Sequence, residues 1–132
     1  MRMNEKIHLS FVVPNRPVAY VRTTRRQMFR DPYYARYRDY KEHFATIAQE
    51  ALQKYPGFYC DKGVPVEFHS IAYIRGRRRM DLDNILKGQW DAMTSVIWHD
   101  DSQVVKATIE KRSVKKEENE RVEVRVSRNE NL

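Results

Sequence analysis

The order in which hydrophobic periods follow one another most restricts the folds open to this chain. Between Ile7 and Val13 apolar residues recur at every second position, which is typical of a half-buried strand that Pro14 then ends. Apolar residues at helical spacing follow from Tyr40 to Leu52. An Asp31-Pro32 pair precedes this run as a helix start, and Pro56-Gly57 ends it. The first third of the chain therefore predicts a strand followed by a long helix.

The rest of the chain repeats this alternation and then adds two further strands. A strand is predicted over Val64–Ile74, and a helix from Asp83 to about Ile97. Strands are predicted over Val104–Glu110 and Arg121–Val126, and the charged, turn-like segment Val114–Asn119 between them predicts a hairpin. The resulting β-α-β-α-β-β order favours an α+β fold in two layers, with two helices packed on a mixed four-stranded sheet.

Length and composition fit one domain over residues 1–132 that acts on a polyanion. The 132 residues include 25 Lys and Arg against 18 Asp and Glu, a formal net charge of +7. The single cysteine, Cys60, excludes an intrachain disulfide and a cysteine-ligated zinc cluster. No run is long and apolar enough for a membrane span, and no signal-peptide pattern begins the chain. We expect a cytoplasmic protein with no membrane partner.

Basic residues concentrate in two tracts, one within residues 14–41 and one at the end of the second predicted strand. Such clusters suit phosphate binding, although they are also compatible with an ordinary solvated surface. The candidate nucleic-acid-binding residues are Arg22, Arg25, Arg26, Arg30, Arg75, Arg77, Arg78 and Arg79.

The second basic tract runs directly into an acidic motif. Asp81 and Asp83 flank one residue, so that in extended backbone both carboxylates point to the same side. Lys87 and Asp91 follow at successive i+4 positions along one polar stripe of the predicted helix. At the far end of that helix comes His99-Asp100-Asp101. If the strand that follows pairs near the strand that leads to Asp81, the acids at both ends would converge.

Carboxylates without cysteine or clustered histidine suit a hard cation such as Mg²⁺. Acids set among arginines suit a phosphodiester substrate, because a metal neutralises developing charge while cations hold the flanking phosphates. Lys87 would then offer a point charge to the scissile phosphate. The residues therefore predict a nucleic-acid-cutting phosphodiesterase.

Each signal also has an ordinary structural interpretation. The Asp-Leu-Asp-Asn run beginning at Asp81 is a plausible helix cap, with Asp83 well placed for that role. Lys87 and Asp91 would form common i,i+4 ion pairs on a solvated face, and Asp100-Asp101 would be turn residues. These alternatives stay open at the level of single residues.

Taken in order, the motif resembles the RusA family of Holliday junction resolvases. The resemblance rests on D81-L-D83-N84-x-x-K87-x-x-x-D91-A92 followed by W98-x-D100-D101-S102-Q103-V104. It implies a homodimeric, Mg²⁺-dependent endodeoxyribonuclease, with Mn²⁺ as a possible substitute metal and no organic cofactor. Its substrate would be a four-way DNA junction, cut by paired nicks, and such genes are often carried by phages and prophages.

Carried over by position, the resemblance assigns a role to each motif residue. Asp81, Asp83 and Asp101 match the essential acids that hold the metal, with Asp100 beside the last of them. Lys87 matches the catalytically important lysine. Two residues match supporting positions: Asn84, and Asp91, whose i+4 relation to Lys87 suggests that it orients that amine. Candidate dimer-interface residues are Trp98, Phe58 and Tyr59.

The chain departs from the family pattern in two places. Many relatives carry a glycine shortly before the tryptophan, where this chain has Thr94-Ser95-Val96-Ile97. Relatives usually have a proline-lysine-glycine-arginine loop, where this chain reads Pro17-Val18-Ala19-Tyr20-Val21-Arg22. Two other functions therefore remain open: a less selective nuclease of flaps, forks or other branched DNA, and a junction-binding protein without catalysis.

Overall fold

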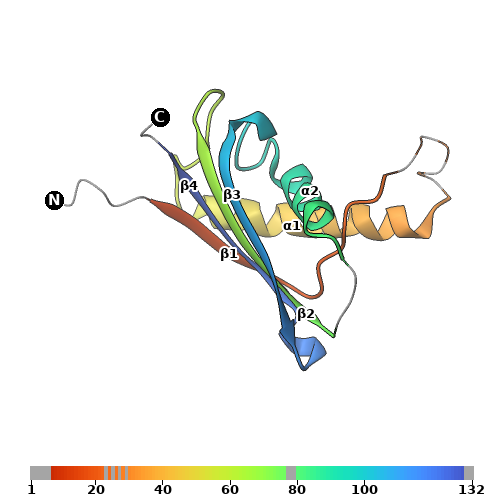
Figure 1. Cartoon of the computed structure of the whole chain (residues 1–132). Coiled ribbons are helices and arrows are strands. Elements are labelled where there is room, and N and C mark those ends of the chain that lie inside the picture. The colour runs from red at the N-terminus through yellow and green to blue at the C-terminus, as the bar shows by residue number, and fades with distance from the viewer. Residues whose placement is uncertain are drawn as a thin grey trace.

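The computed structural model describes residues 7–22, 24, 26, 28, 30–76 and 80–129. Two helices cover one face of a four-stranded sheet, and Figure 1 shows them behind the strands. The elements are β1 (His8–Pro14), α1 (Pro32–Gln53), β2 (Val66–Arg75), α2 (Leu82–Met93), β3 (Val104–Val114) and β4 (Arg121–Arg128), with 3-10 turns η2 (Asp101–Gln103) and η3 (Glu117–Asn119). This architecture confirms the predicted α+β class and its two layers. No helix in the described ranges is long and apolar enough to cross a membrane.

The strands lie in the order β1-β4-β2-β3. β4 is antiparallel to both of its neighbours, whereas β3 is parallel to β2. The predicted hairpin between the last two strands is therefore wrong, because β3 and β4 flank β2 on opposite sides. Charged turn residues signal a change of direction, but they do not determine which strand is the next neighbour. The connection from β3 to β4 passes the end of β2. At this point the Glu120 side chain is buried and accepts a hydrogen bond from the Arg75 backbone N–H at 3.0 Å.

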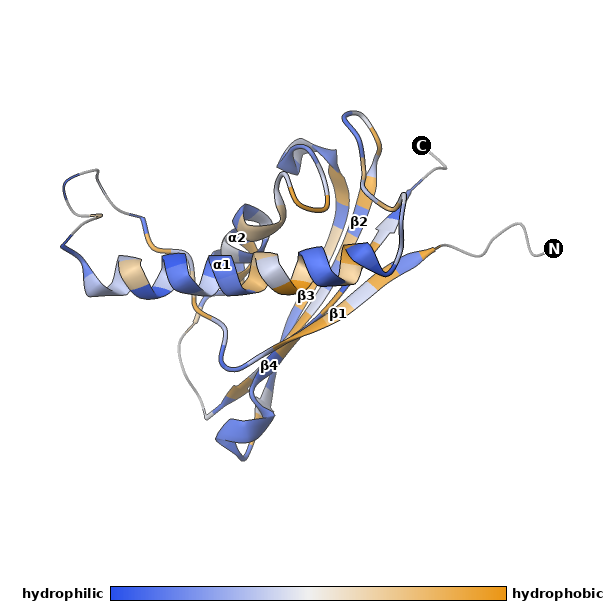
Figure 2. Ribbon diagram, turned by 180° about the vertical axis from the view of Figure 1, so that it is seen from behind, coloured by the Kyte–Doolittle hydropathy of each residue, from blue (hydrophilic) through white to orange (hydrophobic). Residues whose placement is uncertain are grey.

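The core lies between the helices and one face of the sheet. Leu9 and Val13 of β1 are fully buried, and alternate residues of β2 and β4 continue the same face. α1 contributes Phe44, whose ring packs edge-on against Phe11 at a centroid separation of 5.7 Å. Figure 2, viewed from behind, shows α1 crossing this face of the sheet. The period-two and period-3.6 patterns of the sequence thus locate the core correctly.

The start of α1 is as predicted, whereas that of α2 is not. The Asp31 side chain accepts a hydrogen bond from the Tyr33 backbone N–H at 2.9 Å, and Pro32 is the first helical residue. α2 begins at Leu82, so that Asp81, and not Asp83, occupies its N-cap position. The Asp81 side chain makes no capping hydrogen bond there. The carboxylate is therefore not used to close the helix end.

α2 also ends about four residues earlier than predicted. Thr94 leaves the helical conformation with ψ near 130°, while its hydroxyl oxygen lies 2.8 Å from the Trp90 carbonyl oxygen. Ser95 then adopts a left-handed φ of 72°. Ser95 lies in the segment where many relatives carry glycine, the residue that adopts this conformation without steric cost. This chain adopts the left-handed conformation with a serine.

Two of the candidate dimer-interface residues belong to the core of the single chain. Trp98 is 0% exposed and Phe58 is 5% exposed. Trp98 packs edge-on against Phe68 and Trp90, with ring centroids 6.2 and 6.5 Å apart. A surface role for either aromatic side chain is therefore excluded in the folded chain, and only Tyr59 remains partly accessible.

Candidate active site

The N-terminal end of α2 presents two exposed carboxylates. Asp81 and Asp83 are both exposed, and neither forms a hydrogen bond or ion pair with another side chain of the described residues. Asp83 lies in the first turn of α2, where the positive end of the helix dipole favours a negative charge. The Lys111 ammonium donates to the Met80 carbonyl at 2.9 Å and so fixes the entry to the motif. The oxygens of both acids are free to bind a ligand.

The segment between β1 and α1 lies against this end of α2. The Tyr20 backbone N–H donates to the Asn84 carbonyl at 3.0 Å, and the Lys87 ammonium lies 5.7 Å from the centroid of the Tyr20 ring. Gly88 permits this contact, because a Cβ there would lie 3.3 Å from Tyr37 Cε1 and 3.4 Å from the Val18 carbonyl oxygen. The segment that differs from the family loop therefore packs on α2, with the Tyr20 ring beside the exposed Lys87 side chain.

Asp91 does not have the role that its spacing suggests. Its carboxylate accepts a hydrogen bond from the Tyr37 hydroxyl at 2.8 Å. Both Asp91 and Lys87 lie in the described part of the chain, yet they form no ion pair there. Burial raises the pKa of Tyr37 far above its usual value, and the hydrogen bond to Asp91 raises it further. Asp91 thus ties α2 to α1 and does not orient the lysine.

The carboxylate of Asp101 is held beyond the C-terminal end of α2. Its Oδ1 accepts hydrogen bonds from the Thr94 hydroxyl and from Trp98 Nε1, the latter at 3.3 Å. Trp98 Nε1 also lies 3.2 Å from the Thr94 hydroxyl, which closes a three-membered network. No donor among the described residues reaches Oδ2. Asp101 therefore has one oxygen fixed by the fold and one available.

Asp100 caps the turn that leads into β3. Its carboxylate accepts hydrogen bonds from the backbone N–H of Ser102, at 3.0 Å, and from the hydroxyl of the same residue. These two donors lower the pKa of Asp100 below its usual value, the hydroxyl contributing most. Asp100 is exposed, so it remains accessible to a ligand. Its hydrogen bonds, however, are those of a residue that caps a turn.

Gln103 is the structural anchor of the acidic turn. Its side-chain oxygen accepts from the backbone N–H groups of His99 and Asp100 at 2.9 and 2.8 Å. Its nitrogen donates to the carbonyls of Cys60, Asp61 and Val64 at 2.8–3.1 Å. Gln103 belongs to the acidic motif of the sequence, but the resemblance assigns no role to it. The capping-box spacing from Asp100 to Gln103 was the available signal.

The two acidic groups lie at opposite ends of α2 within one chain. α2 has 12 residues and therefore spans about 18 Å. The strand after Asp101 does pair with the strand before Asp81, but it pairs in parallel, so Asp101 precedes the start of β3 while Asp81 follows the end of β2. Convergence would have required an antiparallel pair. Accordingly, the described residues contain no group of three or more His, Cys, Asp or Glu side chains that could hold a metal.

Four of the predicted DNA-binding arginines are exposed in the structure, namely Arg22, Arg26, Arg30 and Arg75. The other four, Arg25, Arg77, Arg78 and Arg79, lie outside the described residues. Arg75 ends β2, and Arg22 follows the segment that packs on α2. Arg22 thus comes two residues after Tyr20, whose backbone contacts α2, and Arg75 comes six residues before Asp81.

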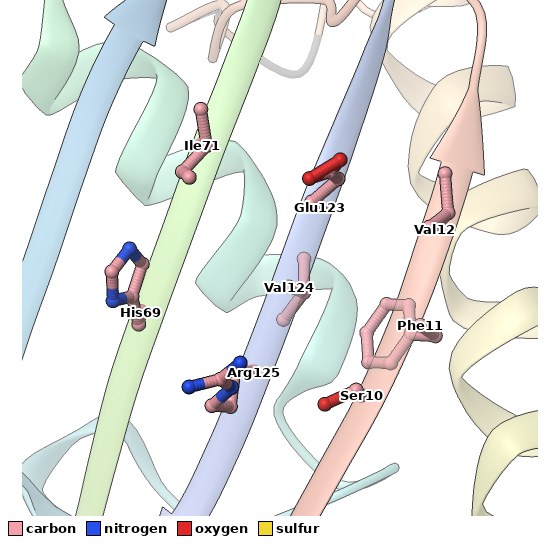
Figure 3. Close-up of a pocket in the computed structure, with 8 residues that line it drawn as sticks. All are labelled: Ser10, Phe11, Val12, His69, Ile71, Glu123, Val124 and Arg125. Atoms are coloured by element: carbon pink, nitrogen blue, oxygen red, sulfur yellow. The ribbon is translucent and has the colours of Figure 1, made fainter.

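Two hollows of similar size lie elsewhere on the surface. One, of about 430 Å³, borders the acidic turn and is lined by Lys62, His99, Asp100 and Val105, among others. The other, of about 440 Å³, lies on the face of the sheet that the helices leave open. Figure 3 shows His69, Glu123 and Arg125 projecting there from β2 and β4. This second hollow contains none of the motif acids, so it is not a candidate for their chemistry.

Comparison with known protein families agrees with the resemblance of the motif. The family model described as endodeoxyribonuclease RusA matches residues 12–127, which include both helices, β2, β3, most of β4, the end of β1 and every acid of the motif. No match was found among curated proteins. A match over most of the chain that contains the complete acidic motif shows that the chain belongs to the RusA endodeoxyribonuclease family.

Proposed function

We propose that this protein is a Mg²⁺-dependent endonuclease that cuts four-way DNA junctions by paired nicks. Family membership supports endodeoxyribonuclease activity. The exposed arginines and the net charge of +7 support a polyanionic substrate, and carboxylate oxygens are the donors that Mg²⁺ prefers. Because the chain belongs to the RusA family, we place the protein in the cytoplasm of a bacterium or of a phage-infected cell.

One observation carries the proposal: the acids are divided between the two ends of α2. Asp81 and Asp83 leave their oxygens unused at one end, whereas Asp101 is held at the other, about 18 Å away along the helix. A single chain therefore does not assemble the ligand set that the motif implies. We propose that the active unit is a homodimer in which Asp81 and Asp83 of one copy meet Asp101 of the other.

A homodimer of this kind also accounts for paired nicking. Two copies related by a two-fold axis would contain two equivalent acidic groups, each assembled from both chains. A four-way junction has approximate two-fold symmetry, so two such groups would act on symmetry-related strands. The bound metal would supply charge neutralisation and an activated water, with Mn²⁺ as a possible replacement for Mg²⁺.

The remaining site residues act through charge and position. The Lys87 ammonium is exposed, lies one turn after Asp83 and rests beside the Tyr20 ring, so it can stabilise negative charge on the phosphate. The exposed arginines bind flanking phosphates, which makes affinity fall steeply as salt rises. Thr94 and Trp98 are positioning residues, because they set the direction of Asp101.

The test mixes two inactive variants, Asp83→Asn and Asp101→Asn, and isolates the heterodimer with two affinity tags. If the acids act across chains, the heterodimer contains one fully intact group, and it should nick one strand of a labelled junction. If all acids act within one chain, both groups are defective and no nicking appears. The latter result would overturn the shared site.

The matched control is the heterodimer of Asp83→Asn with Asp81→Asn. Both substitutions lie at the same end of α2, so neither arrangement leaves an intact group and no nicking is expected. Linear duplex, fork and flap substrates are run with the wild-type protein in parallel. Equal cutting of all of them would replace junction resolution by general nuclease activity, and tight binding without cutting would identify a junction-binding protein.

A further inference from the structure

Lys87 is a candidate catalytic residue that has no acidic partner to fix it. Its side chain is exposed on α2 and forms no ion pair with an acid of the described residues. Asp91, the acid one turn further along α2, is hydrogen-bonded to the Tyr37 hydroxyl instead. A lysine carries its ammonium on a flexible four-carbon stem, so an unheld ammonium would be spread over many positions. The position of Lys87 therefore depends on what else lies beside it.

Tyr20 lies beside Lys87 and is fixed to the first half of α2. Its backbone N–H donates to the Asn84 carbonyl at 3.0 Å. The same segment contacts the helix at Gly88, where an added Cβ would lie 3.4 Å from the Val18 carbonyl oxygen. The Lys87 ammonium lies over the Tyr20 ring, 5.7 Å from its centroid. At this distance the face of an aromatic ring attracts a cation.

The Tyr20 ring is itself held by a buried ring. Tyr37 of α1 packs edge-on against Tyr20, with ring centroids 5.5 Å apart and an interplanar angle of 80°. Tyr37 is 1% exposed, and its hydroxyl donates to the Asp91 carboxylate at 2.8 Å. Tyr20 is therefore fixed at its backbone by α2 and supported at its ring by α1, so that Lys87 meets an ordered aromatic face.

We propose that Tyr20 is a positioning residue, whose ring holds the Lys87 ammonium where it meets the phosphate that is cut. This role rests on the proposed function, in which Lys87 stabilises negative charge on that phosphate. Tyr20 would not touch the reacting atoms, and its effect on the rate of cleavage would pass through the lysine alone.

An aromatic ring suits this task better than a carboxylate. An ion pair with Asp91 would neutralise the ammonium and would have to be broken before the phosphate could use it. The ring attracts the ammonium through its quadrupole and leaves the positive charge in place. The hydrogen bond from Tyr37 also engages an acid that i+4 spacing would otherwise bring within reach of Lys87. The arrangement thus keeps Lys87 both ordered and charged.

The first test measures single-turnover cleavage of a labelled four-way junction by Tyr20→Leu and Tyr20→Phe. Tyr20→Leu should slow cleavage at saturating protein by about fivefold, because the attraction of the ring is lost. The protein concentration that gives half of the maximal rate should stay within about twofold of wild type. Tyr20→Phe keeps the ring and should cut within about 1.5-fold of the wild-type rate. No loss in Tyr20→Leu, an equal loss in both variants, or a change confined to the half-saturating concentration would overturn this role.

Two comparisons restrict the effect to Lys87. In a Lys87→Met background, Tyr20→Leu should cause no further loss, because the charge that the ring holds is already absent. A further loss of about fivefold there would show that Tyr20 acts on another group, and would overturn this role. Tyr33→Leu is the matched control, since it removes a 67% exposed ring that lies 6.0 Å from the Arg36 guanidinium on α1. It should cut at the wild-type rate, and a loss equal to that of Tyr20→Leu would contradict an effect specific to Tyr20.

The contact itself can be measured without DNA. Reductive methylation with isotope-labelled formaldehyde keeps each lysine charged and makes its methyl groups visible by NMR. The Lys87 signal, identified by its absence in Lys87→Arg, should be displaced upfield by the Tyr20 ring and should lose this displacement in Tyr20→Leu. Lys41, whose ammonium lies 4.9 Å from the centroid of the Tyr37 ring, is an internal reference that should keep its own displacement.

The two measurements separate the role of Tyr20 from the proposed function. If the Lys87 signal is not displaced while the wild-type protein cuts junctions, the role of Tyr20 is wrong and the proposed function stands. If the displacement is present in the wild-type protein and lost in Tyr20→Leu, but the wild-type protein cuts no junction, the proposed function is wrong and the contact between Tyr20 and Lys87 stands.

Discussion

Aspartate side chains lie at both ends of α2, but their hydrogen bonding differs between the two ends. At the N-terminal end, Asp81 and Asp83 are exposed and engage no other described side chain. At the C-terminal end, Asp101 is held by Thr94 and Trp98, with Gln103 anchoring the turn that carries it. One end is open to a ligand, while the other is oriented before any ligand arrives.

The difference shows that an acidic motif can serve folding and chemistry at once. Removing a carboxylate from the open end should affect only what binds there. Removing one from the oriented end should also weaken the hydrogen-bond network there, because the buried Trp98 indole N–H and the Thr94 hydroxyl lose a charged acceptor that they share. Activity and stability measured on the same variants therefore separate the two ends.

The largest expected effect is on cleavage by Asp83→Ala and Asp101→Ala. Both should reduce junction cutting by about 1,000-fold, because each removes a charged oxygen from the proposed metal-binding group. Only Asp101→Ala should also lower the free energy of unfolding, by about 2 kcal/mol. Single-turnover cleavage and urea unfolding measure the two effects, and equal destabilisation by both variants would remove the contrast between the ends.

The next effect is on stability alone, through Gln103→Leu. The substitution leaves three carbonyls and two backbone N–H groups without their shared partner, and should cost about 3 kcal/mol. Urea unfolding provides the measurement. Gln49→Leu, at an exposed position on α1, serves as the control and should change stability by less than about 0.5 kcal/mol. A Gln103→Leu protein as stable as wild type would show that the turn does not depend on this anchor.

A smaller effect is expected for Tyr37→Phe, which breaks the link between α1 and Asp91. The loss should be about 1 kcal/mol at neutral pH. Because the folded pKa of Tyr37 is raised, the stability that it contributes is complete below the ordinary value of 10.0 and is lost as pH rises beyond it. The variant should therefore show a shallower decline of stability above about pH 10. Burial also raises the pKa of Tyr40 and of the Cys60 thiol, so both proteins should still lose some stability as the pH rises.

The smallest effect is a gain from Ser95→Gly. Ser95 has a left-handed φ of 72°, which glycine adopts without steric cost. We expect an increase of about 0.5 kcal/mol, since part of the benefit is offset by the greater freedom of glycine in the unfolded chain. Ser113→Gly in β3 should lower stability instead. If both glycines destabilise equally, the turn at Ser95 carries no conformational strain.

The sequence predicted the element types because hydrophobic period follows local geometry. The alternation from Ile7 to Val13 and the Asp31-Pro32 helix start both correspond to observed elements. The neighbour of β4 was not predictable in the same way. Pairing between strands depends on backbone hydrogen bonds formed across the whole sheet, and the charged segment before Arg121 carries no information about them.

For the site, the sequence identified the right residue types but not their partners. The i+4 spacing of Lys87 and Asp91 suggested an ion pair, whereas the Tyr37 hydroxyl, 54 positions before Asp91, is the observed partner. Convergence of the acids likewise depended on whether β3 pairs parallel or antiparallel to β2. Spacing along one helix reports what is near in sequence, and both of these features depend on contacts distant in sequence.

The position of β4 has a consequence for how the chain acquires its structure. β4 is the last of the four described strands in chain order, yet it lies between β1 and β2, and among these strands it is the only one to which β1 is hydrogen-bonded. As the chain leaves the ribosome, β1 has no strand to pair with until residues 121–128 emerge. β1 therefore stays unpaired while the more than one hundred residues between it and β4 are synthesised, and the sheet closes by insertion of β4 between β1 and β2.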